Sequence, residues 1–178
     1  MKNIVLLVVV LSVFTGCGVK KAYLKDSFDC RETAIGDIKL DPVTIIDKRE
    51  GAGVVEFEIP SFSWKGVEDS LFPVISEEQE GIIKDEVRKH SSENGKQYSM
   101  TVFVLKGRKT LKAKRLSAVE IAEFSVKLNI TDGNDIRESS GEALLEISSM
   151  RATYEYMEQL YRKAIREAIH KAIAGLKQ

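Results

Sequence analysis

The side chains best suited to catalysis or metal binding are few and scattered in this chain of 178 residues. Its only histidines are His90 and His170, and two imidazoles make a typical zinc site only when carboxylates complete the ligand set. His90 falls in the last turn of an expected helix, where a cation suits the helix dipole. His170 falls on the polar flank of another, where we expect it to be solvated. Motifs such as His-x-x-x-His, Cys-x-x-Cys and Gly-x-Ser-x-Gly do not occur, so the sequence predicts no catalytic residue, metal site or cofactor.

The amino-terminal segment carries the clearest chemical signal. Lys2 precedes an apolar run over residues 4–14, which is too short to span a bilayer stably and is typical of a secretory signal. The run ends in Phe14-Thr15-Gly16-Cys17, which resembles the lipobox of bacterial lipoproteins, with phenylalanine where that family usually has leucine. The resemblance implies that residues 1–16 are a signal peptide and that Cys17 is acylated, on sulfur (for example with palmitate) and on its new amino terminus.

Two or three acyl chains would hold such a protein stably on a membrane, whereas one chain binds only marginally. Gly18 follows the cysteine, where an aspartate usually retains enterobacterial lipoproteins in the inner membrane. The resemblance therefore favours the outer membrane, on the periplasmic side of the bacterial envelope. An ordinary cleaved signal, releasing a soluble periplasmic protein, is the alternative. An uncleaved membrane helix is disfavoured by Lys20, Lys21 and Lys25.

Acylation of Cys17 would leave Cys30 as the only free thiol. A single cysteine cannot form an internal disulfide, although an oxidising compartment would permit one. Cys30 could be a nucleophile, an intermolecular bridge or a bystander. We favour the bystander, because it lies in a polar stretch with no histidine nearby in the sequence.

The rest of the chain divides into a polar tether over residues 17–37 and a single domain over residues 38–178. The chain has 27 basic and 27 acidic side chains, and its few aromatic residues do not alternate with the basic ones. This composition provides no overall charge or stacking surface for nucleic acid.

Apolar periodicity predicts an α+β domain with an antiparallel or mixed sheet of four to five strands packed by two helices. Ser76 and Gln79 fit a capping box at the start of the first helix, and the second is a long, amphipathic carboxy-terminal helix. A shift in alternation near Ala122 predicts a β-bulge there, with a helix over 110–124 as the competing interpretation. Gly107 and Gly133 are predicted to lie in turns, and residues 60–74 are predicted to be irregular. The expected strands cover residues 38–47, 54–59, 98–105, 116–131 and 136–148.

The order of these elements resembles small envelope lipoproteins of the YajG type and the ABC-transport auxiliary lipoproteins. In those proteins a strand with an Asp-x-Arg element opens the domain, and Asp47-Lys48-Arg49 occupies that place here. The resemblance spans about residues 40–176 and implies an α+β domain without catalytic residues to carry over.

Two surface features could bind partners. One is a run of cations without an acid, which we expect at a solvated hairpin tip and which could contact anionic envelope polymers or an acidic protein face. The other is a loop containing Phe62 and Trp64, which either fills the core or anchors a partner. The basic candidates are Lys106, Arg108, Lys109, Lys112, Lys114 and Arg115.

These observations predict a lipid-anchored envelope protein that acts as a non-catalytic scaffold, accessory subunit or binding module. Its partners would be the membrane, through Cys17, and envelope proteins or anionic polymers. One alternative is a lipid-anchored hydrolase using Asp47, Arg49 and His90, which requires the three to converge in a cleft. The other is a carrier holding an apolar ligand between the sheet and the terminal helix.

Overall fold

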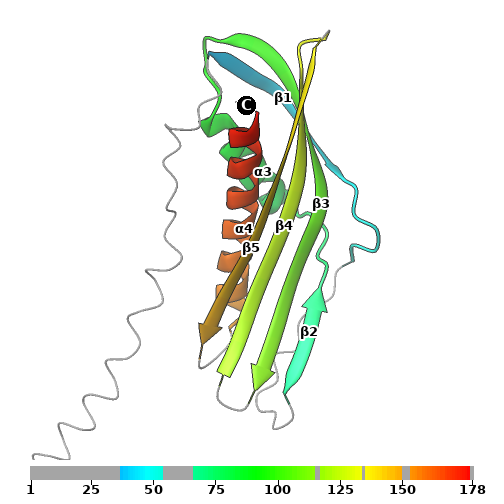
Figure 1. The fold of residues 1–178 in the computed structure, drawn as a ribbon, viewed down its shortest axis with the longest axis vertical. Coiled ribbons are helices and arrows are strands. Elements are labelled where there is room, and N and C mark those ends of the chain that lie inside the picture. The colour runs from blue at the N-terminus through cyan, green and yellow to red at the C-terminus, as the bar shows by residue number, and fades with distance from the viewer. Residues whose placement is uncertain (1–36, 54–65, 115–116, 134, 150–152, 177–178) are drawn as a thin grey trace, which may run out of the picture.

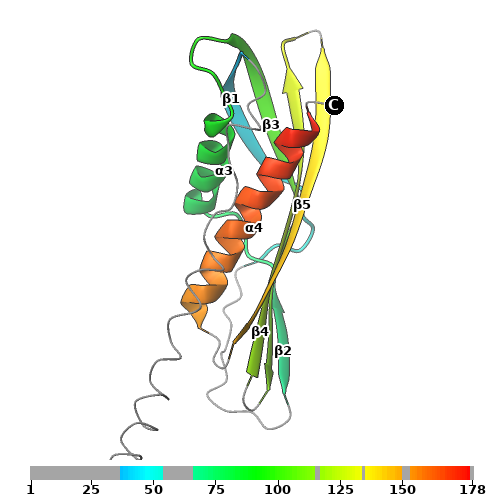
Figure 2. The same cartoon turned by 60° about the vertical axis from the view of Figure 1, so that its left-hand side comes forward.

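A five-stranded mixed sheet with two helices on one of its faces forms the described part of the chain (Figures 1 and 2). The computed structural model describes residues 37–53, 66–114, 117–133, 135–149 and 153–176. The expected α+β class is confirmed. The elements are β1 (Ile38–Asp47), β2 (Val67–Leu71), α3 (Glu77–Lys89), β3 (Lys96–Lys114), β4 (Ser117–Thr131), β5 (Ile136–Ser149) and α4 (Tyr154–Gly175).

Several predicted features are confirmed. β1 has the predicted bounds. It lies at the sheet edge, where Pro42 is tolerated because proline cannot donate to a ladder. Ser76 and Gln79 form both bonds of the capping box. Gly133, with φ of 100°, lies in the tight turn between β4 and β5. The predicted strand over 54–59, and also Phe62, Trp64, Cys17, Cys30 and Arg115, lie outside the described residues.

Strand β3 is the main correction to the sequence analysis. It continues through Lys106–Lys114 instead of ending at residue 105, so this basic segment is a strand and not a hairpin tip. Gly107 is therefore within a strand and not in a turn. The helix over 110–124 is wrong, and β2 occupies part of the segment expected to be irregular.

The bulge predicted near Ala122 is wrong, because β4 alternates and pairs regularly there. A bulge that the sequence analysis did not predict lies in β3. Pairing with β4 runs regularly up to Val104, skips Leu105, and resumes at Lys106 opposite Ser125. The extra residue reverses which side chains point inward. Before it the buried positions are Met100, Val102 and Val104. After it Gly107, Lys109 and Leu111 are buried, and so is Thr110, whose hydroxyl contacts Ser70 of β2.

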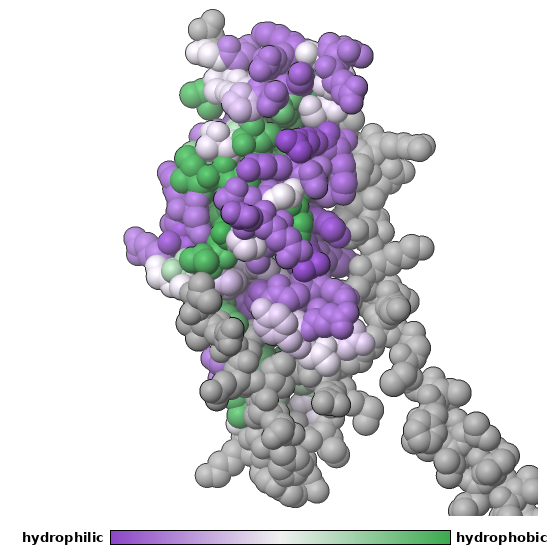
Figure 3. Space-filling model, turned by 180° about the vertical axis from the view of Figure 1, so that it is seen from behind, coloured by the Kyte–Doolittle hydropathy of each residue, from purple (hydrophilic) through white to green (hydrophobic). Residues whose placement is uncertain are grey.

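The core lies between the sheet and the helices. α4 packs on β4 and β5, and α3 packs on α4 and on the edge strand β1. The apolar stripe of α4, including Ile165 and Ile169, is fully buried, and its polar side faces outward on the largely hydrophilic surface seen in Figure 3. Neither helix in the described part of the chain is long and apolar enough to cross a membrane.

Close approach of α4 to β5 depends on Gly141. A β carbon at this position would overlap backbone atoms of Ala168 and Ala172, so the helix axis would have to move. At this point the backbone of α4 therefore lies directly against the backbone of β5.

We expect Gly141→Ala to lower the free energy of unfolding by about 1–3 kcal/mol, the usual cost of overpacking. Gly81→Ala is the matched control, because Gly81 lies in α3 with open space around its α carbon. It should stabilise the protein by up to about 1 kcal/mol through helix propensity. Urea denaturation followed by circular dichroism measures both. Equal effects of the two substitutions would contradict the close helix–sheet contact.

Candidate functional site at the bulge of strand β3

The candidate site lies at a gap along one edge of β3. Parallel pairing with β1 covers β3 up to Val104, and antiparallel pairing with β2 begins at Lys109. Between them, residues 105–108 have no strand neighbour on that side among the described residues. The backbone groups of these residues that face the gap need other hydrogen-bond partners, because leaving a buried carbonyl unpaired is costly.

Arg49 fills this gap. Its Nη1 donates to the Gly107 carbonyl at 3.3 Å, while Nε and Nη2 donate to the Asp47 carboxylate at 2.8 and 2.5 Å. The Arg49 side chain is almost fully buried. Hydrogen bonds from Arg49 hold the pKa of the Asp47 carboxyl below its usual value. Arg49 thereby joins the end of β1 to the middle of β3.

Gly107 makes this arrangement possible because it has no side chain. A β carbon there would overlap the Arg49 guanidinium and the Tyr161 hydroxyl, which come together over the strand. Tyr161 is buried edge-on against Phe124, with ring centroids 5.7 Å apart. Burial raises the pKa of Tyr161 to about 12, although the Arg49 charge opposes the shift, so its hydroxyl stays protonated at neutral pH.

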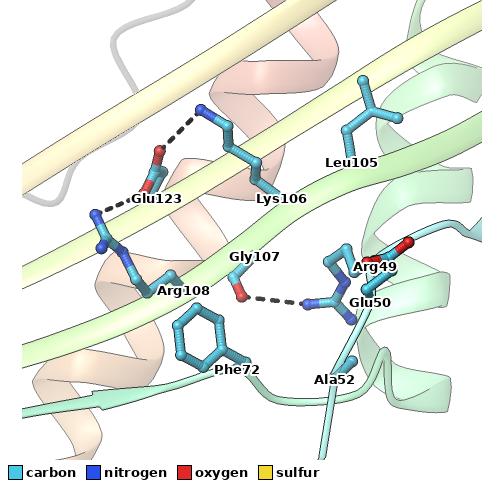
Figure 4. A pocket seen from close by; sticks show the side chains of 9 residues that line it. All are labelled: Arg49, Glu50, Ala52, Phe72, Leu105, Lys106, Gly107, Arg108 and Glu123. Carbon is cyan, nitrogen blue, oxygen red and sulfur yellow. Dashed lines mark hydrogen bonds and ion pairs between the residues drawn. The ribbon is translucent and has the colours of Figure 1, made fainter.

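A pocket of about 430 Å³ opens in front of Arg49 (Figure 4). Two apolar side chains lie on its rim, Phe72 (49% exposed) and Leu105 (41% exposed). The cations Lys106 and Arg108 lie beside them on β3. The full lining is Arg49, Glu50, Ala52, Phe72, Leu105, Lys106, Gly107, Arg108 and Glu123.

Ion pairs across the strands balance the cations of this pocket. Glu123 on β4 contacts Arg108 at 2.9 Å and Lys106 at 3.4 Å, and Lys106 also contacts Glu142 on β5 at 3.2 Å. Lys106, Arg108 and Glu142 are about half-exposed, whereas Glu123 is 13% exposed, so the cations keep contact with water and each pair adds little to stability. The pocket therefore combines apolar anchors with charged groups of both signs.

The other predicted basic residues are distributed differently. Lys112 is exposed and contacts Glu68 of β2 at 3.0 Å. Lys114 is the last residue of β3, and Arg115 lies outside the described residues. Lys109 is 4% exposed and pairs with Glu158 of α4, with its Nζ 4.8 Å from the Tyr161 ring centroid. The expected solvated cluster is thus a strand in which each cation with a described side chain has an acidic partner.

The proposed hydrolase residues do not converge. The Asp47–Arg49 pair lies beside Ile75, just before α3 begins, while His90 caps the opposite end of that helix. A helix of 13 residues separates the two by about 20 Å. His170 is half-buried beside His90 at the contact between α3 and α4, not on the solvated flank where we expected it.

Comparison with known proteins gives no relatives. No protein-family model matches the chain, and no curated protein or solved structure matches it.

Burial of Lys109 leads to a testable contrast with Lys112. We expect Lys109→Glu to lower the free energy of unfolding by about 3–5 kcal/mol, because it places a second carboxylate against Glu158 in a buried site. Lys112→Glu should change it by less than about 1 kcal/mol, because that side chain is exposed. Urea denaturation distinguishes the two. A Lys109→Glu protein as stable as the wild type would contradict the buried pair.

Proposed function

We propose that this chain is a lipid-anchored bacterial cell-envelope protein whose domain is a non-catalytic binding module for another envelope protein. The observation that carries the anchor is the lipobox-like tetrapeptide ending in Cys17 after a short apolar run. In this proposal acyl chains on Cys17 hold the domain on the periplasmic side of the outer membrane. The polar residues 17–37 link the lipid to β1.

A binding role is favoured over catalysis because the described side chains most suited to catalysis have structural partners or lie far apart. Asp47 and Arg49 satisfy one another and the Gly107 carbonyl, which is a structural task. His90 lies at the far end of α3. The Asp47–Arg49 pair also lies at the end of the opening strand, in keeping with the resemblance to auxiliary envelope lipoproteins.

A carrier role for an apolar ligand receives less support. Such a ligand would need space between the sheet and α4, where Gly141 meets the helix backbone and the apolar stripe of α4 is fully buried.

The pocket at the β3 bulge is our choice for the docking site. Exposed apolar groups beside ion pairs suit an extended protein segment, whose apolar side chain could cover Phe72 and Leu105. Leu144 extends the apolar surface, because it lies opposite Glu123 on the neighbouring strand and is largely exposed. A purely anionic polymer fits less well, because Glu50 and Glu123 line the same pocket.

The anchor is tested with Cys17→Ser, which removes the proposed acylation site. We expect this variant to lose palmitate labelling and to move from the detergent phase to the aqueous phase, because one serine cannot carry a thioester-linked chain. Cys30→Ser is the matched control and should keep both properties. Membrane association of Cys17→Ser that survives a salt wash would contradict lipidation as the anchor.

The docking site is tested by placing a photoreactive amino acid at Phe72 or Leu105 in living cells. We expect a defined cross-linked adduct from both positions. Ile136 is the control, because it is 65% exposed but lies at the β4–β5 turn, eight register positions along β4 from Glu123. Adduct formation at all three positions alike, or at Ile136 alone, would contradict docking at the pocket.

A further inference from the structure

The chain's only two histidines lie together, although 79 residues separate them in the sequence. His90 caps the end of α3, and His170 lies in the second half of α4, where the two helices pack side by side (Figure 2). Their ring centroids are 5.6 Å apart, at an angle of 62°. His90 is 1% exposed, whereas His170 is half-buried and gives the pair an opening toward solvent.

A carboxylate completes the group. Glu86 is one helical turn before His90, so both side chains point from the same side of α3. Its Oε1 lies 3.8 Å from His90 Nε2, which is longer than a hydrogen bond. Its Oε2 accepts a hydrogen bond from Lys89 at 2.7 Å, which fixes the orientation of the buried carboxylate.

The spacing fits three ligands of one ion. One donor atom from each of Glu86, His90 and His170 lies within 4.8 Å of the other two. Two atoms bound to the same zinc ion at about 2.1 Å are about 3.4 Å apart at the tetrahedral angle. The 3.8 Å separation of the Glu86 and His90 atoms is close to that value, and the two separations that involve His170 are at most 4.8 Å. Rotation of the half-buried His170 ring would shorten both.

We propose that Glu86, His90 and His170 bind one Zn²⁺ ion that ties the end of α3 to α4. Two imidazoles with one carboxylate, and no thiolate, make a ligand set that zinc accepts. A water molecule on the His170 side would occupy the fourth position. The site is separate from the pocket at the β3 bulge, so the inference does not depend on the proposed function.

The wild-type chain tests this directly. The full chain is expressed with ¹⁵N-histidine and purified without a polyhistidine tag. It is then stripped of metal with EDTA and titrated with Zn²⁺. We expect one ion per chain, and both imidazole spin systems should shift together up to one equivalent. The ion should also raise the melting temperature, because it binds only the folded chain. No stoichiometric binding at millimolar zinc, or a shift of His170 with His90 unchanged, would overturn the proposal.

Variants then locate the site. His170→Gln is chosen over a change at fully buried His90, because it is more compatible with folding; circular dichroism checks the fold. It should weaken zinc binding at least tenfold and reduce the rise in melting temperature at a given zinc concentration. Asp85→Asn, an exposed carboxylate next to Glu86, should bind as the wild type does, and so should Cys30→Ser. Unchanged binding in His170→Gln, or loss confined to Cys30→Ser, would overturn the proposal.

Discussion

The constraint on which this fold depends is the gap along the edge of β3. One long strand carries two short neighbours on the same edge, β1 running parallel and β2 antiparallel, and neither reaches residues 105–108. Arg49 closes this gap, since its planar guanidinium reaches both the Asp47 carboxylate and the Gly107 carbonyl. A lysine has one ammonium group and could not serve both partners in the same geometry.

The bulge at Leu105 and the candidate pocket both lie at this gap in the edge of β3. The extra residue sends Lys109 inward to Glu158 and leaves Lys106 and Arg108 pointing outward to Glu123. It also leaves Leu105 exposed at the rim of the pocket. The chemistry of the pocket is therefore a consequence of how the sheet edge is completed.

Regular periodicity made much of the fold predictable. β1, β4, β5 and both helices show alternation or a helical stripe strong enough to place them, and the caps and the turn at Gly133 have local signatures. The second half of β3 shows no clear apolar alternation, because its inward positions are held by glycine, lysine, leucine and alanine. A cation whose partner lies 49 residues away, as Glu158 does from Lys109, looks solvated in the sequence.

The same limit applies to the candidate sites. The pocket joins the segment after β1, the residue after β2 and the strands β3 and β4, so only the sheet register reveals it. The histidine cluster could be predicted only in part. Glu86 and His90 are one helical turn apart, but nothing in the local sequence indicates that His170 faces them. From the sequence we could state only that the two histidines would need a carboxylate to form a zinc site.

Amide hydrogen exchange in Arg49→Lys measures the central claim most directly. If Arg49 joins the two halves of the sheet edge, exchange should speed up at the end of β1, in β2 and in residues 105–108. The amides of β5 and of the second half of α4 should keep wild-type protection, because their contacts do not involve Arg49. Unchanged protection around Gly107, or an equal loss of protection throughout the domain, would contradict the claim that this arginine locally completes the edge of β3.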